Sequence, residues 1–470
     1  MGRALRMVAW AGLVMALGVR PAAAQETGGG SGSSRPYSGL FGGAEPLGSQ
    51  GQMLSLTFSG FGGWDDAPTG LPEPEDGADQ ERVYLSGIYG GGSATLNYSR
   101  TGDQLALGAY GTSFVGYFPN SRSWYDSQSA GANASVSFDL SPRTTLRVGQ
   151  QATFATEYRV AYQQGVLSDV PLANGESGFD NSLERDPSVY LTTDVDYSYE
   201  VSQKSTLSLF YAYRTRKFLR GGSPRAGLND QGAGARFQRM LTRYAGLRLG
   251  YTYRRARVDA TGDEEGESEA GSFGFHDIDA GITYARSLSL SRKTTLSFST
   301  GSTVAASASG GEDDPLVPDE DDPGIFENPR FFLVGTAALS RELGRSWAAR
   351  AAYARTLNYS EGFRTPSLLD TASVSIGGLM TRRLDFTAGA FYSTAAVGLG
   401  DRNYSSWVAS TQLRAAITRN LAAYVTYYRF NYRFDDGIEI PGSLLRRVDR
   451  QGIRFGLTTW VPLWSTRGRP

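Results

Sequence analysis

Apolar and polar residues alternate along much of this chain, which is the pattern of β-strands with two different faces. In residues 144–159, Leu146, Val148 and Phe154 fall on one face, and Arg147 and Gln151 on the other. The same period recurs in 205–216, 244–254, 293–300 and 347–358. A helix would scatter these apolar residues. The runs reach about 12 to 16 residues, whereas soluble strands usually have about 5 to 6 and a tilted membrane strand needs about 9 to 11.

A short turn signature recurs between the alternating runs. It reads Leu140-Ser-Pro-Arg-Thr-Thr-Leu146 and Leu290-Ser-Arg-Lys-Thr-Thr-Leu296, with looser copies such as Met380-Thr-Arg-Arg-Leu384. One short turn, a strand, one long loop and a returning strand make the repeating unit of an antiparallel up-and-down barrel. Eight short turns, with both chain ends on the periplasmic side, predict eighteen strands, and sixteen is the alternative. These turns are expected near Asp103, Pro142, Gln203, Thr242, Arg292, Glu342, Arg382 and Arg419.

The N-terminus has the features of a secretion signal. Arg3 and Arg6 precede an apolar stretch at 7–19, which is too short to span a bilayer, and Ala24 closes an A-x-A cleavage site. The following residues are rich in Gly and Ser and lack periodicity. We therefore expect a cleaved signal peptide at 1–24, a flexible periplasmic lead-in at 25–52, an outer-membrane β-barrel at 53–464 and a short tail at 465–470.

Composition supports an all-β membrane protein. Aromatic residues make up 12% of the chain and the mean hydropathy is −0.32, a value that a bundle of membrane helices would not have. A barrel tolerates it because only alternate residues face lipid. With no cysteine and one histidine, disulfide scaffolds, thiolate sites and two-histidine metal sites are excluded. The net charge of −1, with no basic run that contains aromatic residues, argues against nucleic acid as a partner.

Arginine is the residue type that stands out on the polar faces. A charge on the lipid face would cost about 2–4 kcal/mol at the midplane, so alternation assigns these residues to the lumen. They either form a pore lining that attracts anions or stacks on sugars, or they pair with lumen acids such as Glu157 in a structural network. Both readings stay open. The lumen candidates are Arg147, Glu157, Arg159, Arg214, Arg216, Arg248, Arg254, Arg350 and Arg454.

Two segments depart from simple alternation. In 421–434, Tyr424, Tyr428 and Phe430 share a face with further aromatic residues, but Leu421 and Val425 lie opposite, so we expect a bulge there. In the last run, 450–464, alternate apolar residues share one face, and the terminal aromatic Trp464 lies off that phase.

At this last run the chain resembles porin-like outer-membrane β-barrel proteins of Gram-negative bacteria, over roughly residues 53–464. In that family the closing strand alternates and ends in an aromatic residue that the barrel-assembly machinery reads. The resemblance implies an outer-membrane location and contact with lipopolysaccharide. The six residues after Trp464 depart from the family pattern. The Ser/Thr-rich turns are also similar to those of uncharacterised porin-like barrels, some of which are linked to exopolysaccharide systems.

The leading hypothesis is a porin-like channel for small hydrophilic solutes, anionic or sugar-like, with an inward loop at 161–187 as the constriction. The alternative is an accessory or scaffold barrel of a surface polysaccharide system. An enzyme is not expected, because nucleophile motifs are missing and His276 and Asp277 are adjacent strand residues with opposite directions. No cofactor or metal is expected: the acidic runs 312–314 and 319–322 fit solvated loops better than calcium sites. A homo-oligomer is one alternative for the assembly.

Overall fold

The computed structural model describes most of the chain beyond residue 50. The described residues are 51–66, 87–118, 125–155, 187–219, 227–258, 261–263, 266–268, 271–288, 294–305, 330–344, 346–359, 366–397, 403–435 and 447–467. In these ranges no helix has the length and apolar character needed to cross a membrane. The predicted signal peptide and most of the lead-in lie outside the described residues, as does the loop 161–187, so these assignments stay predictions.

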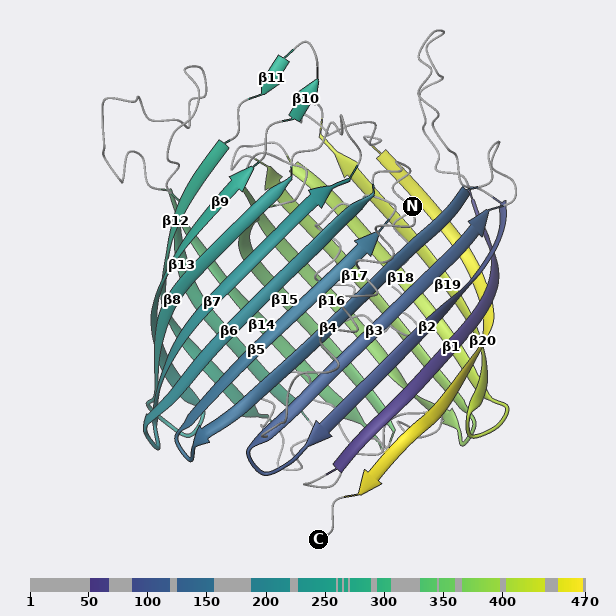
Figure 1. The fold of residues 1–470 in the computed structure, drawn as a ribbon, viewed down its shortest axis with the longest axis horizontal. Helices are drawn as coiled ribbons and strands as arrows, with labels where there is room; N and C mark the ends of the chain where they lie inside the picture. Colours follow the sequence, from purple (N-terminus) through teal and green to yellow (C-terminus); the bar gives the residue numbers. More distant parts are fainter. Residues whose placement is uncertain are drawn as a thin grey trace.

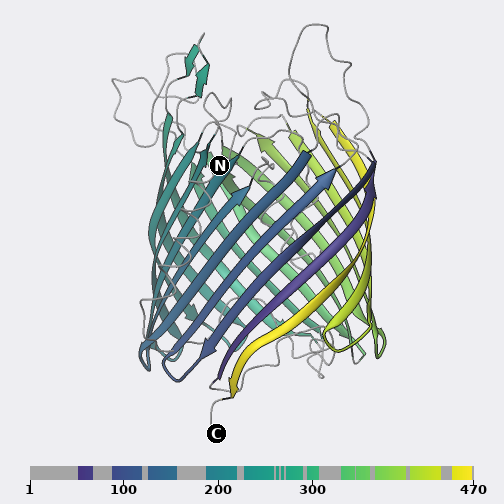
Figure 2. The same ribbon diagram turned by 45° about the vertical axis from the view of Figure 1, so that its right-hand side comes forward.

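Eighteen long strands form one antiparallel sheet that closes into a barrel (Figures 1 and 2). Each strand pairs with its neighbour in the chain, and β1 pairs with β20 to complete the ring. This confirms the predicted fold class and strand number. The strands are β1 (Gly51–Asp65), β2 (Gly87–Thr101), β3 (Leu105–Phe118), β4 (Tyr125–Ser141), β5 (Thr144–Ala155), β6 (Ser188–Ser202), β7 (Ser205–Phe218), β8 (Leu228–Met240), β9 (Ala245–Val258), β12 (Gly271–Ser287), β13 (Thr294–Ala305), β14 (Arg330–Leu343), β15 (Trp347–Tyr359), β16 (Pro366–Thr381), β17 (Leu384–Val397), β18 (Asn403–Ala416), β19 (Leu421–Phe434) and β20 (Arg447–Arg467).

Some details at the ends of the strands were not predicted. Strand β1 begins at Gly51, two residues before the expected start at Met53, and β20 continues to Arg467, into the expected tail. A small hairpin of β10 (Thr261–Asp263) and β11 (Gly266–Ser268) rises from the loop end of the barrel between β9 and β12 (Figure 1).

The recurring turn signature has a physical cause in its hydroxyl residue. The Oγ of Ser141 accepts a hydrogen bond from the backbone N–H of Arg143 at 3.3 Å. The equivalent hydroxyls of Ser202, Thr242, Thr381 and Thr418 likewise accept the N–H two residues later, at 3.2–3.3 Å. A Ser or Thr side chain that satisfies a turn amide favours a tight reversal. The same signature therefore marks short turns along most of the chain.

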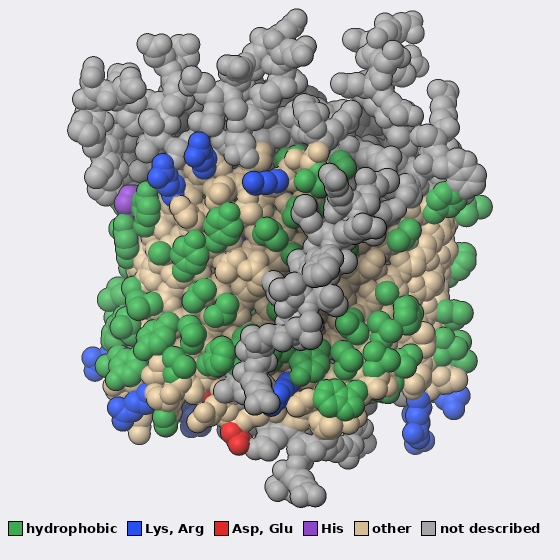
Figure 3. Space-filling view, viewed as in Figure 1, with side chains coloured by type: hydrophobic (Ala, Val, Ile, Leu, Met, Phe, Trp, Pro, Cys, Tyr) green, Lys and Arg blue, Asp and Glu red, His purple; other side chains and the backbone are tan. Residues whose placement is uncertain are grey.

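The outer face of the barrel is apolar, as a lipid-facing surface must be. Along β9 the outward residues Leu249, Tyr251 and Tyr253 are 48%, 48% and 44% exposed. Figure 3 shows hydrophobic side chains spread over the outer surface between the loop end and the turn end. The residues between them on each strand face the lumen. Because the sheet closes on itself through the pairing of β1 with β20, the fold is that of a transmembrane β-barrel.

The expected bulge in 421–434 is wrong. The register of β19 is continuous with β18 and with β20. Alternation is strict, and Leu421, Val425 and Tyr427 form the outer face. The aromatic face is the lumen face, where Tyr428 is 1% and Phe430 is 3% exposed. The error arose because apolar character was equated with lipid contact. Here the rings pack on one another instead: Tyr404 and Phe434, for example, have ring centroids 4.7 Å apart.

A bulge does occur in β20, and it corrects the phase of Trp464. Leu54 pairs with Trp464, but Ser55 pairs with Pro462, so Leu463 is an extra residue on β20. The extra residue returns Trp464 to the outer face, where it is 45% exposed. The terminal aromatic therefore faces outward with the other apolar residues of the closing strand, although simple alternation predicted the opposite.

The hairpin of β14 and β15 forks at its loop end. The two strands pair from Leu343 and Trp347 up to Gly335 and Arg355, and no further pair follows within the described residues. The upper arms, 330–334 and 356–359, keep their pairing only with β13 and β16. Phe331 and Leu333 on the free arm of β14 are 73% and 71% exposed. The barrel wall is thus split between these two arms.

Candidate functional site

The seven described lumen candidates all lie on the face opposite the apolar outer residues. Arg147, Arg248 and Arg350 are each the fourth residue of their strands, β5, β9 and β15, so they form one tier near the turn end. Arg214 and Arg254 are each the tenth residue of β7 and β9, with Arg216 above them, and Arg454 lies on β20. Glu157 and Arg159 lie outside the described residues.

In the upper tier, Arg214 forms an ion pair and Arg216 lies against an aromatic ring. Arg214 donates from Nε to the carboxylate of Asp230 at 3.0 Å, and its Nη2 also binds that carboxylate. The guanidinium of Arg216 lies 5.3 Å from the ring centroid of Tyr190, and the residue is only 6% exposed. These contacts give both side chains a structural role in the wall.

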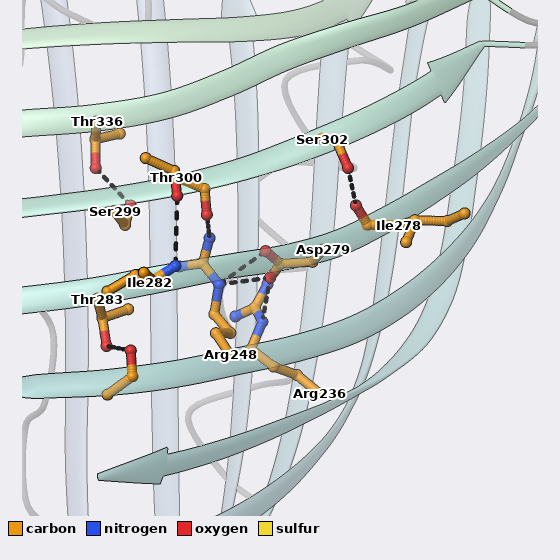
Figure 4. A network of polar contacts seen from close by, with 11 residues as sticks. Arg236, Arg248, Ile278, Asp279, Ile282, Thr283, Ser299, Thr300, Ser302 and Thr336 are labelled. Atoms are coloured by element: carbon orange, nitrogen blue, oxygen red, sulfur yellow. Dashed lines mark hydrogen bonds and ion pairs between the residues drawn. The ribbon is translucent and has the colours of Figure 1, made fainter. Parts of the chain in front are cut away.

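In the lower tier, Arg248 and Arg236 share one carboxylate (Figure 4). Arg248 donates from Nε to Oδ1 of Asp279 at 2.8 Å, and Arg236 donates from Nε to Oδ2 at 3.0 Å. The three residues come from β9, β8 and β12, so the cluster ties three adjacent strands together on the lumen side. Two guanidinium groups on one carboxylate leave a net positive charge at this point of the wall.

Arg248 also repairs a defect in the sheet. The ladder between β12 and β13 shifts register between His276 and Thr283, which leaves backbone groups in this stretch without ladder partners. Nη2 of Arg248 donates to the carbonyl oxygen of Thr300 at 3.1 Å. Nearby, Ile282 N–H donates to Thr300 Oγ1 at 3.4 Å, and Ser302 Oγ donates to the Ile278 carbonyl at 3.1 Å (Figure 4). Side chains thus replace part of the missing ladder.

Arg454 is enclosed by aromatic rings. Its guanidinium carbon lies 4.3 Å from the ring centroid of Phe61, and its Nε donates to the hydroxyl of Tyr89 at 3.4 Å. The residue is 2% exposed. It belongs to the buried inner wall on β19, β20, β1 and β2, so solute in the lumen does not reach it directly.

Sequence reasoning missed the acidic partners and two further arginines. Asp230, Arg236 and Asp279 lie outside the segments whose alternation the sequence analysis assigned. Asp385, 1% exposed, pairs with Arg414, whose Nη2 lies 2.6 Å from its carboxylate. Strict alternation counted from each short turn would have placed all five on the lumen side. The pairing itself depends on the register between strands far apart in sequence.

His276 lies on the outer face of β12. Its Nδ1 is 2.6 Å from the hydroxyl of Tyr251, and its ring centroid is 5.2 Å from that of Tyr253. It is therefore part of an aromatic row that faces outward, away from the lumen. Among the residues with described side chains, no three His, Asp or Glu residues are grouped so that they could hold a metal ion.

Comparisons with known proteins find likenesses of shape at low sequence identity. No family model and no curated protein matches it. The iron transporter FrpB of Neisseria meningitidis is similar at 10% identity and a TM-score of 0.43, covering 90% of this chain and 82% of that chain. OpdO of Pseudomonas aeruginosa is similar at 14% identity and a TM-score of 0.40, covering 88% of this chain and 98% of that chain. The siderophore receptor PirA of the same species is similar at 8% identity and a TM-score of 0.39, covering 87% of this chain and 80% of that chain. At these values, none of them supplies a ligand or an activity for this chain.

Proposed function

We propose that this protein is an outer-membrane channel for passive diffusion of small hydrophilic solutes, with lumen arginines that favour anions or sugars. An eighteen-stranded barrel is wide enough to enclose an aqueous path. Its outer face suits lipid and its inner face carries charges on several strands. Passage through such a barrel needs no reacting group, so the proposed activity is transport and not an enzymatic reaction.

One observation carries the proposal: arginines of several strands lie on the lumen face at two heights and are partly exposed. Arg248, in the lower tier, contacts Asp279 and the Thr300 carbonyl. Arg147 and Arg350 occupy the same level on β5 and β15 and are half-buried. In the upper tier Arg254 is also half-buried. Because partly solvated cations in a confined space attract anions, we assign solute contact to Arg147, Arg254 and Arg350.

The test is single-channel conductance of the purified full-length protein in a planar bilayer, with a salt gradient to measure ion selectivity. We expect a steady conductance with anion preference, and we expect Arg350→Ala and Arg147→Ala to shift the reversal potential toward cations. Arg429→Ala is the matched control, because this residue lies on the outer face of β19. A shift of equal size in the control, or no shift in the lumen variants, would rule out the assigned residues.

A second candidate function rests on the inner faces of β18 and β19. Tyr404, Tyr428 and Tyr432 face the lumen and yet are 0%, 1% and 2% exposed. A lumen wall without solvent contact favours a scaffold or accessory barrel of a surface polysaccharide system over an open pore. A correctly folded protein that gives no conductance in the bilayer would support this alternative and contradict the channel.

Location and assembly are part of the proposal. We infer export by cleavage after Ala24, insertion by the barrel-assembly machinery and residence among lipopolysaccharide. Outer-membrane fractionation and N-terminal sequencing of the mature protein test these points. Cross-linking in native membranes tests the homo-oligomer.

A further inference from the structure

The outer face of β9 changes its chemistry in three steps toward the loop end. From the turn upward, the outward residues are Leu247 and Leu249, then Tyr251 and Tyr253, then Arg255 and Arg257. Successive outward residues are about 6.7 Å apart along a strand. Acyl chains, the interface and charged headgroups follow one another on the same length scale in a leaflet. The strand is therefore stratified like the lipid beside it.

The neighbouring strands share these layers. In register, Tyr211 of β7, Ala233 of β8, Tyr253 of β9 and His276 of β12 form one outward row. The next two rows place Gln231 beside Arg255, and Asn229 beside Arg257. A few residues of this polar layer already form contacts: Asn229 donates to the hydroxyl of Tyr213 at 3.4 Å.

The polar layer is rich in cations. Lys217, at the upper end of β7, points outward and is exposed, as are Arg255 and Arg257 on β9. Figure 3 shows Lys and Arg side chains gathered on the outer surface near the loop end of the barrel, directly above hydrophobic side chains. Within the part of the chain that the structure describes, neither Lys217 nor Arg257 forms a salt bridge with an acidic residue. We call Lys217, Arg255 and Arg257 the upper basic patch.

A second outward surface, on β19 and β20, has the same order of residue types. On β19 the outward residues pass from Val425 through Tyr427 to charged residues. Arg429 is neutralised by Asp449 of β20 at 2.9 Å. Above this pair, Arg433 and Arg447 are directly opposite each other, and both are exposed. Like charges in such a position repel, and an anion bound between them would remove the cost.

We propose that the upper basic patch binds the phosphate groups of a phosphorylated glycolipid of the outer leaflet, the lipid A part of lipopolysaccharide. The cations meet the phosphates, the tyrosines and His276 lie beside the sugar, and Leu247 and Leu249 contact the acyl chains. The pair Arg433 and Arg447 is a second phosphate contact of the same kind. The site rests on the proposed outer-membrane location but not on solute transport.

The test is native mass spectrometry of the purified full-length protein titrated with bisphosphorylated lipid A in detergent. We expect Lys217→Gln combined with Arg257→Gln to weaken binding by at least about tenfold. Arg243→Gln is the matched control, since this exposed residue lies in a short turn at the other end of the barrel. Binding should also weaken with increasing salt, because the patch is exposed.

The lipid series separates the sources of the anion. Monophosphorylated lipid A should bind more weakly than the bisphosphorylated form, and phosphatidylglycerol more weakly still, because it has no sugar. Millimolar inorganic phosphate should not displace the lipid. The inference is overturned if the double variant binds like the parent, if the control loses as much, or if inorganic phosphate competes fully. Conductance is measured on the same preparations, so failure of this site is distinguishable from failure of the channel.

Discussion

Tyr428 of β19 lies over Gly452 of β20, its direct cross-strand partner on the lumen side. A Cβ added at Gly452 would come within 2.6 Å of Cζ of this tyrosine. Tyr424 and Gly456 repeat the arrangement four residues along each strand, where a Cβ at Gly456 would lie 2.8 Å from Cζ of Tyr424. The two glycines provide the space in which the rings lie flat against the sheet. The packing of the buried inner wall therefore depends on two glycines, which the alternation of apolar and polar residues does not single out.

Replacing Gly452 by Val should destabilise the barrel by about 1–3 kcal/mol, because the side chain must displace the ring of Tyr428. The measurement is urea unfolding in lipid vesicles, followed by the mobility of unheated samples on SDS gels. Gly60→Val is the control, since nothing lies within 4 Å of a Cβ at Gly60 on the outer face of β1. Equal stability of the two variants would contradict the packing argument.

Arg248→Ala should destabilise the barrel by about 2 kcal/mol, because the carbonyl of Thr300 and the carboxylate of Asp279 both lose a charged donor. Arg236→Ala should cost less than about 1 kcal/mol, since its side chain is 43% exposed against 18% for Arg248. Thermal unfolding monitored by circular dichroism compares the two. A larger loss for Arg236 would show that the repaired ladder contributes little.

The fold could be predicted from the sequence because two local signals agree. The turn hydroxyls, such as Ser141 and Thr418, and the period-2 pattern between them are both short-range signals. The structure confirms the strand count and seven of the eight short turns, and the turn near Arg292 lies outside the described residues. The face on which a strand residue lies also follows from local alternation, provided that the strand has no bulge. Where Leu463 adds one, the face of Trp464 depends on pairing with Leu54 of β1, more than four hundred residues away in the chain.

The site was less accessible to sequence reasoning. Lumen direction followed from alternation for Arg147, Arg248 and Arg350, but the partners of each charge depend on its cross-strand neighbours. Arg248 meets Asp279 only because β9 lies beside β12, with β10 and β11 excluded from the main sheet. The bulge expected in β19 was wrong for a related reason: an aromatic face is equally suited to lipid and to a packed inner wall.

The fork between β14 and β15 predicts different disulfide yields at two heights. The chain has no cysteine, so any disulfide within one molecule joins the two introduced residues. Ala337→Cys with Tyr353→Cys joins paired residues and should oxidise readily. Leu333→Cys with Leu357→Cys would be opposite if the ladder continued, and should stay largely reduced. The measurement is the gel mobility of the oxidised protein in vesicles. Equal oxidation of both pairs would show that the upper arms of β14 and β15 are paired with each other in the membrane.

The bulge in β20 makes a prediction about two tryptophans of one strand. Trp460 pairs with Thr57 on the lumen side, and Trp464, four residues later, pairs with Leu54 on the outer side. Without the extra residue Leu463, positions four apart would share a face. In single-tryptophan variants with the other six changed to Phe, lipids that carry a doxyl group near the headgroup should quench Trp464 strongly and Trp460 weakly. Trp64, 45% exposed on the outer face of β1, is the positive control. Quenching of Trp460 as strong as that of Trp464 would remove the bulge, and with it the outward terminal aromatic of the closing strand.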